Sequence, residues 1–139
     1  MTKTLPESVE SAIAQCGAFL ASGERKRALV ALQSIPGEFL AHPLVLTATW
    51  EYYAQGKDWE RALAVADILV AADLDSPQGW MLKTECHANL KQHDLLHESL
   101  SAAVSLFPNN AVLVGRLEAV RASLGAAFNI KETINPGLN

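Results

Sequence analysis

Cysteine is scarce in this 139-residue chain, and Cys16 and Cys86 form no CxxC pair. A disulfide framework and a zinc ribbon are therefore excluded, and a reducing compartment, the cytoplasm, is expected. No glycine-rich phosphate loop or nucleophile elbow is present. No apolar run approaches the length that spans a bilayer, and the apolar stretch 12–21 lacks the cleavage site of a secretory signal. We expect no enzymatic activity, no cofactor and no bound metal.

Charge is also sparse, at 19% of residues against 50% hydrophobic residues, so the chain is too apolar to be disordered. The net charge of −4 argues against nucleic-acid binding. β-branched residues are few: 9 Val and 5 Ile stand against 22 Ala and 20 Leu. Because Ala and Leu lose little rotamer freedom in a helix, the composition disfavours strands and predicts one all-α domain.

Proline and glycine divide the chain into amphipathic segments, each about the length of a short globular helix. The expected helices cover residues 6–23, 24–34, 43–55, 59–72, 77–91, 95–106 and 111–124. We expect Asp58 and Asp94 to cap the helices that follow them, and Gly125 to end the last helix. Tight turns at Gly23, at Gly56 and near His93 then join these helices in pairs.

Small residues recur where paired helices would cross, and the interval from Pro43 to Pro77 matches the length of one helix pair. Helix pairs of about 34 residues are typical of repeat proteins. The sequence resembles the tetratricopeptide repeat (TPR) family. The matching residues are Ala12, Cys16, Phe19, Gly23, Ala28 and Leu32; Tyr53, Trp59, Ala62 and Ala66; Trp80, Leu100, Ala103 and Pro108; and Val114, Leu117 and Gly125. The turn near Gln92-His93 falls slightly late for this pattern.

The resemblance implies a right-handed superhelix of antiparallel helix pairs, with about three repeats and a capping helix. The units are 6–36, 43–76 and 77–108, followed by a half unit at 111–125 and a tail at 126–139. The first helix of each unit lines a concave groove in this family. The groove residues that the resemblance implies are Thr47, Glu51 and Gln55, then Met81, Glu85 and Asn89, flanked by Glu10, Ile13 and Gly17 and by Gly115, Ala119 and Ala122.

Family members that clamp a peptide carboxylate use Lys, Arg and Asn on this stripe, whereas Thr, Glu and Met occupy it here. A co-chaperone that binds Hsp70 or Hsp90 tails is therefore not expected. Glu51 and Glu85 favour a peptide or protein surface with basic residues, and Met81 favours an apolar segment. Since Tyr52 and Tyr53 are adjacent on a helix, we expect one of them to be exposed to a partner.

Several hypotheses for function stay open. A non-catalytic adaptor is favoured, and its partner is either a filament of bacterial tubulin, as for kinesin-light-chain-like proteins, or an export substrate, as for secretion-system chaperones. The basic run Arg25-Lys26-Arg27 allows membrane contact. A metalloprotein built on His87, His93 and His97 is the alternative from another class. The seventh helix is too apolar to cap the array alone, so the tail or a second subunit is expected to cover it.

Overall fold

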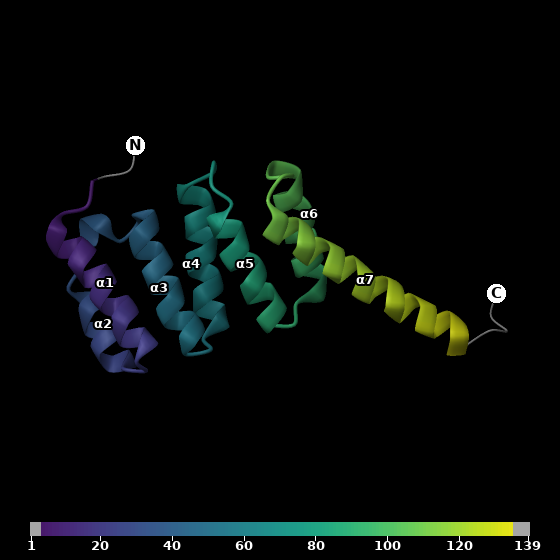
Figure 1. Cartoon of the computed structure of the whole chain (residues 1–139), viewed down its shortest axis with the longest axis horizontal. Helices are drawn as coiled ribbons and strands as arrows, with labels where there is room; N and C mark the ends of the chain where they lie inside the picture. Colours follow the sequence, from purple (N-terminus) through teal and green to yellow (C-terminus); the bar gives the residue numbers. More distant parts are fainter. Residues whose placement is uncertain (1–3, 135–139) are drawn as a thin grey trace.

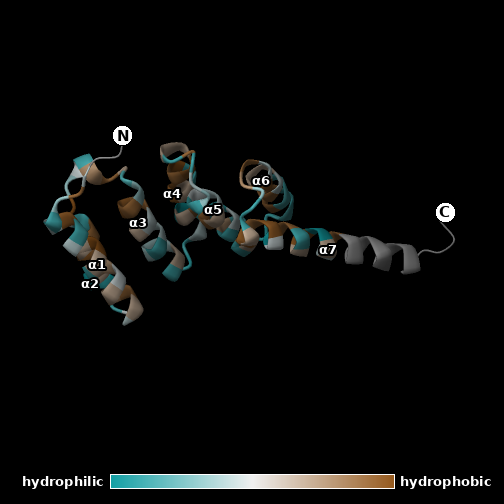
Figure 2. Ribbon diagram, turned by 45° about the horizontal axis from the view of Figure 1, so that its top comes forward, coloured by the Kyte–Doolittle hydropathy of each residue, from teal (hydrophilic) through white to brown (hydrophobic). Residues whose placement is uncertain are grey.

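The computed structural model is built from α-helices that follow one another along the chain (Figure 1). They are α1 (Glu7–Ala21), α2 (Arg25–Gln33), α3 (Pro43–Gln55), α4 (Trp59–Ala72), α5 (Gln78–Asn89), α6 (His93–Leu106) and α7 (Ala111–Ile134), with a 3-10 turn η1 at Gly37–Phe39. The structure describes the backbone of residues 4–134 and the side chains of residues 4–124, and residues 4–134 contain no strand. The expected all-α fold is confirmed, with hydrophobic and hydrophilic residues mixed along the helices (Figure 2).

Successive helices run antiparallel, so their connections alternate between two edges of the array (Figure 1). The short turns at 22–24, 56–58 and 90–92 lie along one edge, which we call the turn edge. The longer connections at 34–42, 73–77 and 107–110 lie along the opposite edge, the loop edge. Each helix therefore packs mainly against its neighbours in sequence.

The turns recur at regular intervals of about 34 residues, which we call the repeat period. Gly23, Lys57 and Lys91 have positive φ angles of 78°, 59° and 57°. The residue after each one donates its backbone N–H to the carbonyl at the end of the preceding helix, from Glu24 to Phe19 at 2.8 Å, from Asp58 to Tyr53 at 2.9 Å and from Gln92 to His87 at 3.0 Å. The sequence suggested that the third turn falls late, but in the structure it lies at the same regular interval as the other two. In the second turn the left-handed residue is Lys57, whereas Gly56 has a φ of −78°.

The core repeats with the same period. Cys16, Trp50 and Thr84 are buried at equivalent positions of the three first helices, and Ala28, Ala62 and Leu96 are buried at equivalent positions of the three second helices. Three clusters of buried residues result, one at each successive level of the stack. Small residues such as Ala28 and Ala62 let the paired helices approach closely.

The two adjacent tyrosines are both half-buried, so the expectation that one is exposed was wrong. Tyr52 packs against the first core cluster and Tyr53 against the second, with ring centroids 5.5 Å apart. A helix that lies between two others buries more than one face, and for this reason neighbouring residues on α3 both find apolar contacts.

Helix α5 lies very close to α4 at Gly79. A Cβ atom placed there lies 2.7 Å from the backbone nitrogen of Val70 and 2.8 Å from its Cγ2 atom. No side chain larger than hydrogen fits at this distance unless the helices move apart. No local pattern in the sequence distinguishes this glycine from the others, because the contact is with another helix.

The last two helices differ from expectation in two respects. The N-cap of α6 is Gln92, and Asp94 lies inside the helix without a capping hydrogen bond. Gly125 does not end α7, which continues to Ile134 and extends away from the stacked pairs (Figure 1). Leu113 and Leu117 belong to the third cluster, whereas Glu118 and Arg121 are exposed, as are the apolar Val112 and Leu124. The side chains of the tail 126–139, which was expected to cover this helix, lie outside the described residues.

Candidate binding groove

The first helices of successive units lie side by side, because one polar side chain joins each pair of them. Gln55 of α3 donates a hydrogen bond to the carbonyl of Leu20 on α1. Trp50 Nε1 on α3 donates to Cys86 Sγ on α5 at 3.3 Å. Arg116 of α7 donates to the Met81 carbonyl at 2.7 Å and to Thr84 Oγ1 at 3.0 Å on α5. A stripe across α1, α3, α5 and α7 is therefore a continuous surface.

Glu51 lies in the middle of this stripe. Its side chain is exposed and has no hydrogen bond or ion pair with any other residue among 4–124. Partial burial raises the pKa of the Glu51 carboxyl above its ordinary value. Its charge also helps to raise the pKa of the Cys16 thiol on α1, although burial of the thiol is the larger cause. Glu51 is thus a carboxylate that the fold partly desolvates without compensating its charge.

Glu85 occupies the equivalent position on α5, one repeat period later. It is half-buried, and its side chain likewise has no ion-pair partner among residues 4–124. Its charge contributes to the raised pKa of Cys86, about 11, for which burial is the main cause. The stripe therefore carries two uncompensated carboxylates at equivalent positions on neighbouring first helices.

The other expected groove residues are more engaged in the fold. Thr47 donates its hydroxyl to the Pro43 carbonyl at 2.8 Å, and Asn89 donates its amide to the Glu85 carbonyl at 2.9 Å. The side-chain amide of Gln55 already donates its hydrogen bond to the Leu20 carbonyl. Met81 is half-buried against the third core cluster, with its Sδ atom 4.0 Å from Asn110 Nδ2.

The ends of the stripe have smaller or less polar surfaces. On α1, Glu10 is exposed, Ile13 packs partly against the first core cluster, and the space beside Gly17 is open. On α7, the three expected groove residues are exposed and small, and the space beside the first of them is also open: Gly115, Ala119 and Ala122. The charge of the stripe is thus concentrated on α3 and α5.

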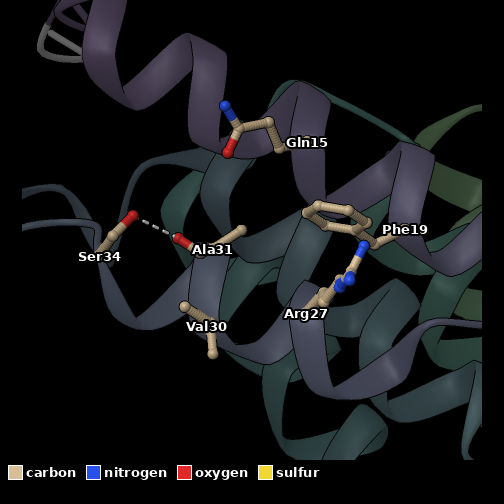
Figure 3. A pocket seen from close by; sticks show the side chains of 6 residues that line it. All are labelled: Gln15, Phe19, Arg27, Val30, Ala31 and Ser34. Carbon is tan, nitrogen blue, oxygen red and sulfur yellow. Dashed lines mark hydrogen bonds between the residues drawn. The ribbon is translucent and has the colours of Figure 1, made fainter.

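Several hollows in the described part of the surface lie outside the stripe, and two of them lie between helices. One lies between α1 and α2 at the N-terminal end of the array, with Phe19 and Val30 among its lining residues, and Figure 3 shows it. The other lies between α2 and α3 and is apolar; its lining residues are Leu29, Leu32, Gln33, Ile35, Leu40, Val45, Thr49, Tyr52 and Tyr53. Neither hollow contains a charged residue other than Arg27.

The histidines do not form a metal centre in the described part of the chain. His87 is buried, and its Nδ1 atom lies 2.8 Å from the Gln92 Oε1 atom that accepts its hydrogen bond. Among the residues searched, no three His, Cys, Asp or Glu side chains gather where they could hold a metal ion. His87 occupies the position of Phe19 and Tyr53 in the earlier units, so it fills a packing position.

The basic run at the first turn is largely engaged within the fold. Arg25 donates to the Tyr52 carbonyl at 2.7 Å, and its guanidinium lies 4.2 Å from the centre of the Tyr52 ring. Arg27 pairs with Glu24 at 3.2 Å. Lys26 is exposed. None of the helices searched among the described residues has both the length and the hydropathy that crossing a membrane requires.

A stack of antiparallel helix pairs that repeats about every 34 residues and is closed by a single helix is the fold of TPR domains. The solved structures that it resembles include the first TPR domain of the human RPAP3 protein, with a TM-score of 0.72, 14% sequence identity, and coverage of 90% of this chain and 98% of that one. The first TPR of Spaghetti (RPAP3), bound to the HSP90 peptide SRMEEVD, has a TM-score of 0.68 and 13% identity, and covers 86% of this chain and 97% of its own. No protein-family model matches the sequence, and the search of curated proteins gives no match. The likeness therefore establishes the fold.

Proposed function

We propose that this protein is a non-catalytic adaptor of the cytoplasm whose groove stripe binds a peptide or protein surface with basic and apolar residues. The observation that carries the proposal is the pair Glu51 and Glu85, two carboxylates at equivalent positions of adjacent first helices without a cationic partner among residues 4–124. Uncompensated charges at a surface select a partner of opposite sign. Met81, beside this pair, favours an apolar contact.

The peptide-bound TPR domain supports a peptide or protein as the partner of this chain. The peptide SRMEEVD bound to that domain is acidic. Acidic side chains on α3 and α5 repel such a peptide and attract Lys and Arg. We therefore infer that the groove uses the common architecture of TPR domains for a partner of opposite charge.

The test uses two labelled peptides, one that alternates Lys and Leu and the acidic peptide SRMEEVD, with binding followed by fluorescence anisotropy. We expect the basic peptide to bind and the acidic one not to bind. The double variant Glu51→Gln/Glu85→Gln is expected to weaken binding of the basic peptide by about 5- to 30-fold, since two partly exposed ion pairs contribute about 0.5–1 kcal/mol each.

The matched control is Glu60→Gln/Glu98→Gln, which makes the same change of charge at exposed positions on α4 and α6. It is expected to leave the affinity within about twofold. Equal losses in the two double variants show that net charge acts alone and reject the groove. Binding of SRMEEVD in preference to the basic peptide rejects the proposed ligand chemistry.

Two narrower forms of the proposal predict different assemblies of this protein. A partner of a bacterial tubulin filament is expected to co-sediment with filaments, with Lys26 available for membrane contact. A chaperone for an export substrate is expected to be a dimer, for example through the C-terminal helix. Co-sedimentation with filaments and light scattering distinguish the two.

A further inference from the structure

The loop edge carries exposed apolar side chains at every junction between units. Leu40 and Leu44 lie at the first junction, Leu74 at the second, and Leu106 and Val112 at the third, with exposed fractions of 51%, 56%, 73%, 60% and 46%. A single exposed leucine is ordinary, but a series of them along one edge forms an extended apolar surface. Figure 1 shows these three connections on the same edge.

Four of these five residues follow the period of the fold. Leu40 and Leu74 lie one repeat period apart, and Leu44 and Val112 lie two periods apart. Equivalent positions in stacked units form a line along the array. Leu40 and Leu74, and likewise Leu44 and Val112, therefore lie at equivalent positions of the loop edge, and Leu106 adds to the third junction outside this register.

The loop edge and the turn edge differ in the charge of their side chains. No Lys or Arg occurs in residues 28–56, 62–82 or 98–115, the segments that form the loop edge and the helices leading to it. Asp73 and Asp75 flank Leu74 there. Most of the cations lie at the turn edge instead: Arg25, Lys26, Arg27, Lys57, Arg61 and Lys91. Within these segments the loop edge is therefore apolar and acidic, and it lacks a cation of its own.

We propose that the loop edge is a second docking surface, separate from the groove stripe, and that its partner is a basic amphipathic helix of another protein. The apolar face of such a helix covers the leucines, and its Lys or Arg residues meet Asp73 and Asp75. An anionic membrane is disfavoured because its charge has the same sign as this edge. Two separate docking surfaces are what an adaptor needs in order to join two partners.

The test titrates the full chain with a labelled model helix of Leu and Lys in amphipathic order, and with its counterpart of Leu and Glu. We expect the Leu/Lys helix to bind and to shift the amide resonances of the loop edge in NMR spectra. Leu40→Ser/Leu74→Ser is expected to weaken binding about 10-fold or more. Asp73→Asn/Asp75→Asn is expected to weaken it by a smaller factor, and this loss is expected to shrink at high salt.

The matched control is Val30→Ser/Leu95→Ser, which removes two exposed apolar side chains away from the loop edge, and it is expected to change the affinity less than twofold. The affinity for the loop edge is read from the resonances of that edge, and Glu51→Gln/Glu85→Gln is expected to leave this affinity unchanged while it weakens binding at the groove stripe. Failure of the groove proposal and failure of this one therefore give different results. Urea unfolding of each variant confirms that it is folded.

Each of the following binding results overturns the proposal: resonance shifts confined to the groove stripe, equal binding of the Leu/Glu helix, full affinity in Leu40→Ser/Leu74→Ser, or no binding of the Leu/Lys helix. A mass that rises with concentration in light scattering, and that falls to the monomer value in Leu40→Ser/Leu74→Ser, shows that a second copy of this chain occupies the edge and also overturns it.

Discussion

Replacement of Gly79 by Ala tests how tightly the second and third units are packed. The added Cβ atom lies 2.7 Å from the backbone nitrogen, 2.8 Å from the Cγ2 atom and 3.0 Å from the Cα atom of Val70. Two of these three atoms belong to the backbone, so a change of rotamer cannot relieve the overlap. Helices α4 and α5 must separate, and overpacking of this kind costs about 1–3 kcal/mol.

The same substitution has a favourable term, because Ala is a better helix former than Gly by about 0.5–1 kcal/mol. This term is at the low end here, since Gly79 is the second residue of α5. The net expectation is a destabilisation of about 1–2 kcal/mol, measured by urea unfolding with far-UV circular dichroism.

Gly115→Ala is the matched control. Gly115 lies within α7, is exposed, and has no atom within 4 Å of an added Cβ. Only the favourable term applies there, so this variant is expected to gain about 0.5–1 kcal/mol. If Gly79→Ala is as stable as Gly115→Ala, the close approach of α4 and α5 does not limit the side chain at position 79, and our account of this packing is wrong.

Further predictions concern the turns and the buried polar groups. Lys57→Gly is expected to exceed Lys57→Ala in stability by about 1 kcal/mol, because φ is positive at this residue; equal urea midpoints contradict this. His87→Ala is expected to lose about 2–4 kcal/mol through the cavity and the unpaired Gln92, whereas Gln92→Ala loses less; the reverse order in urea refutes the packing role. With a pKa of about 11, the Cys86 thiol stays protonated and slow to react with iodoacetamide at pH 8, and rapid labelling of the folded protein opposes this. Because this folded pKa lies above the ordinary value of 9.0, its contribution to stability is complete below about pH 9 and falls as the pH rises toward 11; unfolding midpoints that do not fall over this range count against it.

Glu51 is expected to affect the stability of the fold and the binding of the peptide in opposite directions. The raised pKa of Glu51 means that its charged form is less favoured in the folded chain, so Glu51→Gln is expected to be neutral or stabilising at pH 7 while it weakens the basic peptide. Binding of that peptide is expected to decline as the pH falls through the raised pKa of Glu51. A variant that is both less stable and unchanged in binding indicates a structural role for Glu51.

The helices themselves could be predicted because the signals are local. Pro43 and Gln55 bound α3, and Trp59 and Ala72 bound α4, as the sequence indicated from proline, glycine and the Asp58 cap. The end of α7 could not be predicted in this way. A glycine after a periodic segment predicts a C-cap, yet a glycine is also tolerated inside a helix at modest cost, and α7 continues through Gly125.

The sparse cysteine excluded a disulfide framework, the scarcity of charge excluded disorder, and the excess of Ala and Leu over Val and Ile predicted an all-α chain. The regular spacing of proline, glycine and small residues predicted its repeat. These follow from composition and periodicity because propensity and amphipathic order act within one helix. Tertiary structure alone decided which polar residues stay uncompensated and which are used inside the fold. Gln55 and Arg25 are engaged by neighbouring helices whereas Glu51 and Glu85 are not, because a hydrogen bond between helices depends on their approach, and no signal within one helix records it.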